Sequence, residues 1–195
     1  QATPNRFQGF GRLTLDNVLP LGDSPGFSTN VYDRESVVSS QTKTYTITID
    51  SGSTADLRVT LVWTDPPPSA GAARILVHDL DLLVTDPSGT SFFPNGRTSA
   101  DTINNVERVN IPNAQLTAGD QYTITVTANP LAVSNTQEYA LVINGGFSAD
   151  RGPQGGPSGR SGGSGDSAVD WIAAGVVISV FGIAAIGLMA FFYVK

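Results

Sequence analysis

The 195-residue sequence contains no cysteine, and this absence excludes several kinds of chemistry at once. Without thiols the chain forms no disulfide, no thiolate metal site and no cysteine nucleophile. The pattern Asn-x-Ser/Thr, which accepts N-linked glycans, does not occur either. The compartment therefore has to be inferred from other parts of the sequence.

Charge is also scarce, because Asp, Glu, Lys and Arg make up only 14% of the chain. In residues 1–147 fourteen acidic side chains stand against eight basic ones, so the net charge of −6 lies in this region. An acidic surface repels the phosphate backbone and offers no footprint for DNA or RNA. Nucleic acid is therefore not expected as a partner.

Helical periodicity is hard to find after Pro20, whereas alternation of apolar and polar residues is frequent. This alternation is typical of half-buried strands. It predicts strands at Thr42–Asp50, Leu57–Thr64, Ile75–Thr85, Ser91–Phe93, Val106–Ile111, Gln121–Ala128 and Glu138–Asn144. About eight short strands separated by turns predict an all-β fold, a jelly-roll-like antiparallel β-sandwich over residues 21–147.

The C-terminal part contrasts with this pattern. Residues 148–170 are rich in Gly and Ser and have almost no apolar surface, so they predict a flexible linker. Residues 171–194 carry no charge, and Trp171 and Tyr193 lie near the two ends. A helix of this length reaches across a bilayer core of about 30 Å, so it predicts a single transmembrane helix anchored in lipid. A buried helix of a soluble protein is the alternative, but such helices rarely run this long without a charge.

Asp50, His78 and Ser91 occur in the order of one serine-protease triad. Ser91, however, follows a strong turn sequence and begins a strand, so its amide neighbours belong to a sheet ladder. A lone His in an alternating strand is usually a surface or packing residue. We therefore expect no catalysis by this chain alone.

Two oxygen-rich stretches predict a cation site. Asp79 and Asp81 are two residues apart in a predicted strand, so their carboxylates are expected on the same face, where a hard divalent cation would neutralise them. Asp101, Asn104 and Glu107 belong to the second stretch. No EF-hand spacing is present, and solvated edges and turns remain the alternative interpretation.

Several separated motifs resemble subtilisin-like serine proteases. Gln8–Leu19 (QGFGRLTLDNVL) resembles the segment that closes the catalytic domain in that family. The motifs that follow resemble the C-terminal β-sandwich of one bacterial-type branch: LRVTLVWTDPP (Leu57–Pro67), LVHDLDLLVTDPSG (Leu76–Gly89), NNVERV (Asn104–Val109) and YALVINGGF (Tyr139–Phe147). The resemblance covers residues 1–147 almost continuously.

The resemblance has implications for fold, site and function. It makes residues 1–20 the remnant of a catalytic domain whose triad lies upstream, and it implies calcium near Asp79 and Asp81. The chain would then be the non-catalytic, membrane-anchored C-terminal part of a serine endopeptidase, supporting its folding, stability or substrate access. A structural or adhesion subunit of a membrane assembly, retaining only the sandwich, is the alternative.

The same resemblance predicts a location and a partner. The sandwich is expected on the exoplasmic or lumenal side, because extracellular protease domains have this form and Lys195 is the only charge after the helix. Phe7, Phe10, Leu13, Leu15 and Val18 would expose apolar surface once separated from a catalytic domain. We therefore expect another polypeptide, either the severed catalytic domain or a membrane-complex subunit, to cover them.

Overall fold

The described part of the chain is all-β. The computed structural model describes residues 4–5, 7–15 and 27–148, which lie within one compact unit, Gln1–Gly156. Its strands are β1 (Ser28–Val38), β2 (Thr42–Ile49), β3 (Leu57–Trp63), β4 (Leu80–Thr85), β5 (Ser91–Phe92), β6 (Val106–Ile111), β7 (Gln121–Ala128), β8 (Thr136–Gly145) and β9 (Phe147–Ser148). Two 3-10 turns, η2 (Pro94–Gly96) and η3 (Asn113–Gln115), flank β6.

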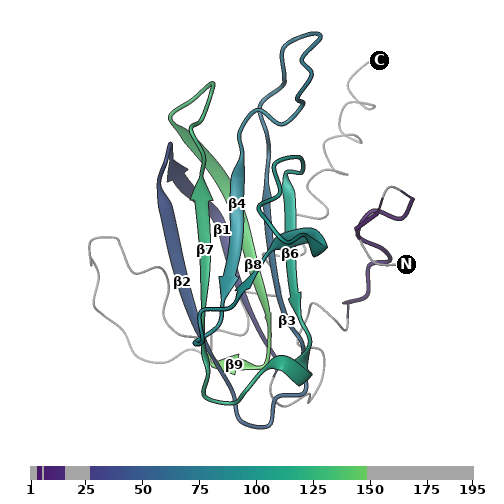
Figure 1. The fold of residues 1–195 in the computed structure, drawn as a ribbon, viewed down its shortest axis with the longest axis vertical. Helices are drawn as coiled ribbons and strands as arrows, with labels where there is room; N and C mark the ends of the chain where they lie inside the picture. The colour runs from purple at the N-terminus through teal and green to yellow at the C-terminus, as the bar shows by residue number, and fades with distance from the viewer. Residues whose placement is uncertain (1–3, 6, 16–26, 149–195) are drawn as a thin grey trace, which may run out of the picture. The chain divides into compact units, whose positions relative to one another are not determined.

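The strands form two antiparallel sheets (Figure 1). The first has the order β1-β8-β3-β6 and the second the order β5-β4-β7-β2-β9. β6 and β5 are edge strands of different sheets. They lie on the same side of the sandwich, as the contacts between β4 and β6 across the two layers indicate. This side of the sandwich carries the residues discussed below.

One hydrophobic core lies between the sheets, and the alternation in the sequence predicts which side chains enter it. Leu57, Val59, Leu61 and Trp63 of β3 are all buried, and the residues between them are not. The second sheet contributes buried residues with the same period, including Tyr45, Ile47 and Ile49 of β2. The prediction of a two-sheet, core-forming antiparallel fold is therefore confirmed.

The sequence analysis missed strand β1. A bulge at Asp33 and Arg34 shifts the register with β8 between Tyr32 and Glu35, and Arg34 has a positive φ of 56°. Only Val37 of β1 is buried. Because β1 is an edge strand interrupted by a bulge, it lacks the regular alternation by which strands are recognised.

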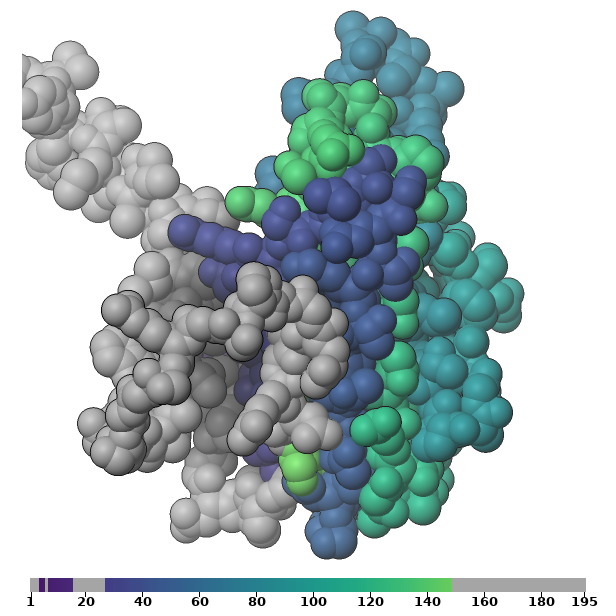
Figure 2. Space-filling view, turned by 90° about the vertical axis from the view of Figure 1, so that its left-hand side faces the viewer, coloured from purple at the N-terminus to yellow at the C-terminus, as the bar shows by residue number. Residues whose placement is uncertain are grey.

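The strand predicted at Ile75–Thr85 begins too early. β4 starts at Leu80, because backbone N–H groups before it bond to a side chain and not to a neighbouring strand. The N–H groups of Val77 and His78 donate to the two carboxylate oxygens of Asp65, at 2.8 and 2.7 Å, where a strand would bond to a neighbour. Loops 64–79 and 129–135 project beyond the strands at the same end of the sandwich (Figures 1 and 2).

The predicted linker from residue 149 onward and the predicted transmembrane helix at 171–194 lie outside the described residues. Within the ranges that the structure describes, no helix is long and apolar enough to cross a membrane.

Candidate cation site

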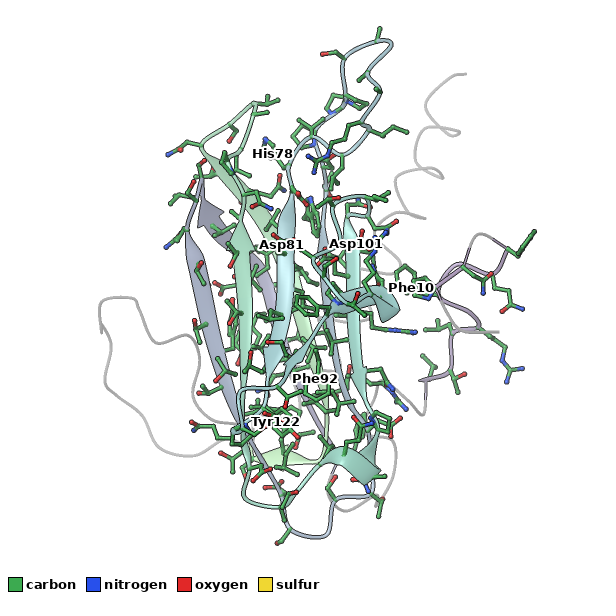
Figure 3. All side chains as sticks on the ribbon, viewed as in Figure 1. Phe10, His78, Asp81, Phe92, Asp101 and Tyr122 are labelled. Carbon is green, nitrogen blue, oxygen red and sulfur yellow. The ribbon has the colours of Figure 1, made fainter. Side chains whose placement is uncertain are left out.

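Four acidic residues lie near the side of the sandwich that is formed by the edge strands β5 and β6. Asp79 immediately precedes β4, Asp81 lies on β4, Glu107 lies on β6, and Asp101 belongs to the loop that leads into β6. Figure 3 shows Asp81 and Asp101 at similar height, on the β4 and β6 sides respectively. The fold therefore brings together the two acidic stretches that are separated in the sequence.

Glu107 links the two sheets. Its side chain is fully buried, because Glu107 alternates with the core residues Val109 and Ile111 along β6. Its Oε2 accepts a 2.6 Å hydrogen bond from the backbone N–H of Leu82. β5 pairs with β4 only at Val84 and Thr85, so the carboxylate takes the place of a strand neighbour beside Leu82. Its Oε1 has no hydrogen-bond partner.

Asp79 and Asp81 are each bound on one side only. Asp79 Oδ2 forms an ion pair with the guanidinium of Arg74 at 2.7 Å, and Asp81 Oδ2 accepts a 2.8 Å hydrogen bond from the side-chain amide of Asn129. The other oxygen of each carboxylate is buried and has no partner. In the described residues, the three buried side-chain oxygens without a partner are thus Asp79 Oδ1, Asp81 Oδ1 and Glu107 Oε1.

Asp101, in contrast, is fully bonded, although its side chain is completely buried. The amides of Asn95 and Asn104 each donate to Oδ2 at 2.7 Å, and the backbone N–H of Ile103 donates to Oδ1 at 3.1 Å. Arg97 Nε lies 3.2 Å from the same Oδ2. Asp101 therefore organises the loop before β6 and holds Asn104 beside the acidic cluster.

The electrostatics follow from this bonding. Burial raises the pKa of Glu107 to about 9, and Asp81, Asp101 and Asp79 add to the rise although the Leu82 bond opposes it. Burial also raises the pKa of Asp81, with contributions from Asp79 and Asp101. Burial acts in the same direction on Asp101, but the bonds from Asn95 and Asn104 outweigh it and lower its pKa. With a pKa of about 9, Glu107 holds its proton at neutral pH when no cation is bound, because the bonds of the cluster do not stabilise a further negative charge.

Buried oxygens without a donor are costly, and they are often explained by a bound ion or water. Carboxylate and amide oxygens are the ligands of calcium, so the donor set fits this cation. In the described ranges, no three His or acidic side chains are grouped closely enough to hold a metal as they stand. The arrangement therefore supplies donors near one another without a closed coordination shell.

The structure modifies the prediction for individual residues. Asp79 lies one residue before β4 and Asp81 lies on it, and the backbone carbonyl of Asp79 accepts from the N–H of Asn129 at 2.9 Å. The residues that the sequence analysis missed are the partners Arg74, Asn95 and Asn129. Of these only Asn95 carries a signal, an Asn-Gly pair, and it adopts a left-handed conformation with φ of 57°.

Asp50, His78 and Ser91 have separate environments. Asp50 accepts a hydrogen bond from Ser148 Oγ, while Ser91 is exposed on β5. His78 is buried, with Nδ1 2.7 Å from Gln137 Oε1, and its Nε2 accepts from the backbone N–H of Val133 at 3.3 Å. The structure thus shows no hydrogen bond among these three side chains, all of which it describes.

No protein-family model matches the chain. Two curated proteins of Dictyostelium discoideum are similar to it. Serine protease/ABC transporter B family protein tagA is 27% identical over 152 residues, covering 70% of this chain and 8% of the relative. Serine protease/ABC transporter B family protein tagB is 31% identical over 177 residues, covering 72% of this chain and 9% of the relative. The chain therefore has a distant, protease-related similarity to a small part of each relative.

Proposed function

We propose that this chain is a non-catalytic part of a subtilisin-like serine endopeptidase that supports the folding, stability or substrate access of a catalytic domain. The observation that carries this proposal is the similarity to two proteins named for a serine protease, each over about 70% of this chain. The four motifs between Leu57 and Phe147 that resemble a protease β-sandwich fall on β3, β4, β6 and β8 and reach the first residue of β9, which supports the proposal.

The proposed fold type is a jelly roll. Two sheets of the order β1-β8-β3-β6 and β5-β4-β7-β2 support it, because among the described strands β4 and β5 form the one pair that is consecutive in sequence. A jelly roll consists of eight strands in two sheets with Greek-key connections. Under this proposal β9 is an addition at the edge next to β2.

Calcium is the proposed cofactor. Asp79, Asp81 and Glu107 would supply carboxylate oxygens, because each has one buried oxygen without a partner. Asp101, whose oxygens are already bonded, would take part by holding Asn104 in the loop before β6. The cation would supply the charge that the cluster lacks and would join β4 of one sheet to β6 of the other, so its proposed role is structural.

The proposed location is a membrane surface, with the sandwich exoplasmic or lumenal and residues 171–194 in lipid. The names of both relatives join a serine protease to an ABC transporter, which supports a place at a membrane. The uncharged sequence of residues 171–194 is the other support.

The proposed partner is a polypeptide that covers the N-terminal segment. Phe7, Leu13 and Leu15 are 74%, 73% and 53% exposed, although they are large and apolar. Phe10 contacts the sandwich, since the guanidinium of Arg108 lies 5.5 Å from its ring centre. Because Arg108 lies on β6, this contact supports the docking of a catalytic domain beside that strand, where the exposed apolar side chains would be buried.

Replacing Leu13 and Leu15 by Ser is expected to release this partner. Burial of a leucine side chain contributes about 1.5–3 kcal/mol, so the double variant should retain at least tenfold less partner. The measurement is quantitative mass spectrometry of the full chain isolated natively in mild detergent. Ile103→Ser is the matched control, because Ile103 is 65% exposed in a loop of the sandwich. Equal partner retention by the double variant would exclude this segment as the docking surface.

A further inference from the structure

The outer edge of β6 is only partly covered. β6 is the last strand of its sheet, so one side of its backbone has no neighbouring strand. The side chain of Asn95 occupies the first part of that side as a strand would. Its Nδ2 donates to the carbonyl of Val106 at 3.0 Å, and its Oδ1 accepts from the N–H of Arg108 at 3.1 Å.

The second part of the edge remains open. In a strand the N–H and C=O groups of every second residue point to the same edge. Because Val106 and Arg108 bond outward to Asn95, Asn110 also points its backbone N–H and C=O outward. Among the described residues, none bonds to these two backbone groups, although Arg58 donates to the side chain of Asn110 at 3.2 Å. An open pair of this kind is the element to which an added strand binds.

A groove lies beside this open pair, between the edge strands β5 and β6. It has a volume of about 320 Å³, within the range of known ligand sites. Phe92, Phe93 and Val109 form its apolar lining, and Arg97, Thr98 and Asn110 contribute polar groups. Figure 3 shows Phe92 on this side of the sandwich. The groove can therefore receive an apolar side chain of a strand that pairs with Asn110.

The charges around the groove favour an acidic ligand. Arg97 lines it and Arg108 belongs to β6 itself, in a chain whose net charge is −6, whereas Arg58, which binds Asn110, is already paired with Asp56 at 3.1 Å. Within the described residues, no side chain accepts a hydrogen bond from the Nη groups of Arg97, although its Nε lies beside Asp101. A second copy of this chain is a poorer fit, because antiparallel pairing of two β6 edges would bring these arginines together.

We propose that this groove binds an extended acidic peptide by strand addition to β6. The peptide backbone pairs with the N–H and C=O of Asn110, continuing the line that Asn95 begins. One aliphatic side chain enters the lining of Phe92, Phe93 and Val109, and a carboxylate of the peptide binds Arg97. The main-chain bonds give affinity and the groove with its arginine gives specificity.

The test uses a fluorescein-labelled probe, Thr-Leu-Thr-Leu-Asp-Asp, and the full chain in mild detergent with calcium present. We expect saturable binding by fluorescence polarisation. A matched probe ending in Lys-Lys and a probe with N-methylated backbone amides should each bind at least about tenfold more weakly. Equal binding of the acidic and basic probes, or no saturable binding of the acidic one, would overturn the proposal.

Two pairs of measurements locate the site. Asn110→Pro removes the outward N–H and should bind the acidic probe about tenfold more weakly than Asn110→Ala, which removes the same side chain but keeps the N–H. Arg97→Glu should reverse the preference, so that the Lys-Lys probe binds more tightly than the acidic one. Unfolding of a variant cannot produce such a reversal. Unchanged preference in Arg97→Glu, or a dimer of the chain that Asn110→Pro disrupts, would contradict a peptide at this edge.

Discussion

Addition of calcium to the chain, after EGTA has removed bound cations, is expected to raise the melting temperature by roughly 10 °C. A ligand present at about 100 times its dissociation constant stabilises the folded state by about 2.7 kcal/mol, and for a domain of this size each kcal/mol corresponds to about 4 °C. The expected cause is neutralisation of the buried oxygens of Asp79, Asp81 and Glu107 that have no partner. Scanning calorimetry of the full chain in detergent, with EGTA or with about 1 mM calcium, measures this shift.

A double variant carrying Asp79→Asn and Asp81→Asn should lose most of the calcium response. Asp33→Asn is the matched control, because Asp33 is an exposed acid in the β1 bulge, and it should keep the response. Equal melting temperatures with calcium and with EGTA in the wild-type chain would contradict a stabilising cation at these acids.

The pH dependence of folding stability in EGTA provides a second test of the same cluster. The pKa of Glu107 rises from 4.5 to about 9 on folding, so the folded chain keeps a proton that the unfolded chain releases. The resulting stability is fully present below pH 4.5 and is lost as the pH rises toward about 9. Glu107→Gln is neutral without taking up a proton on folding, so at pH 8 in EGTA it should exceed wild type in stability by on the order of a few kcal/mol. A variant that is less stable than wild type under these conditions would contradict a raised pKa at this position.

Leu61→Ala is expected to destabilise the sandwich by about 2–5 kcal/mol, because it opens a cavity between the sheets. Leu61 is fully buried on β3, which lies between β8 and β6. The adjacent residue is the matched control, since Val62 faces outward and is 39% exposed. Val62→Ala should therefore cost about 0.5 kcal/mol or less.

Urea unfolding of both variants in the full chain measures this difference. Similar losses of stability in the two variants would contradict the register of β3, because a shift by one residue exchanges the two faces of a strand. A larger loss in Val62→Ala than in Leu61→Ala would place the core on the wrong side of this sheet.

The alternation of apolar residues predicted most of the fold. β2, β3, β6 and β7 could be located because one face of each strand enters the core, and the predicted ranges agree closely with the structure. β1 could not be found, since its bulge and its mostly exposed side chains remove the periodic signal. The start of β4 was misplaced because Asp65 captures two backbone N–H groups, a long-range bond that no local pattern reveals.

The acidic residues of the candidate site could also be identified from the sequence, but their arrangement could not. Their residue types indicate oxygen ligands wherever the fold places them. That Glu107 is fully buried and bound to Leu82 depends on how two strands of different sheets meet. The contacts of Asp79 with Arg74 and of Asp81 with Asn129 depend on loops, and such pairings follow from the folded geometry alone.

Fluorophosphonate labelling of the natively isolated assembly tests whether this chain is a non-catalytic part of a serine endopeptidase. This reagent reacts with the activated serine of a serine endopeptidase, which requires a base positioned beside the hydroxyl. We expect the label on a co-isolated polypeptide with a subtilisin-like sequence, and no label on this chain. Label on Ser91 of this chain, or a chain isolated without any labelled partner, would contradict its assignment as a non-catalytic part of a serine protease.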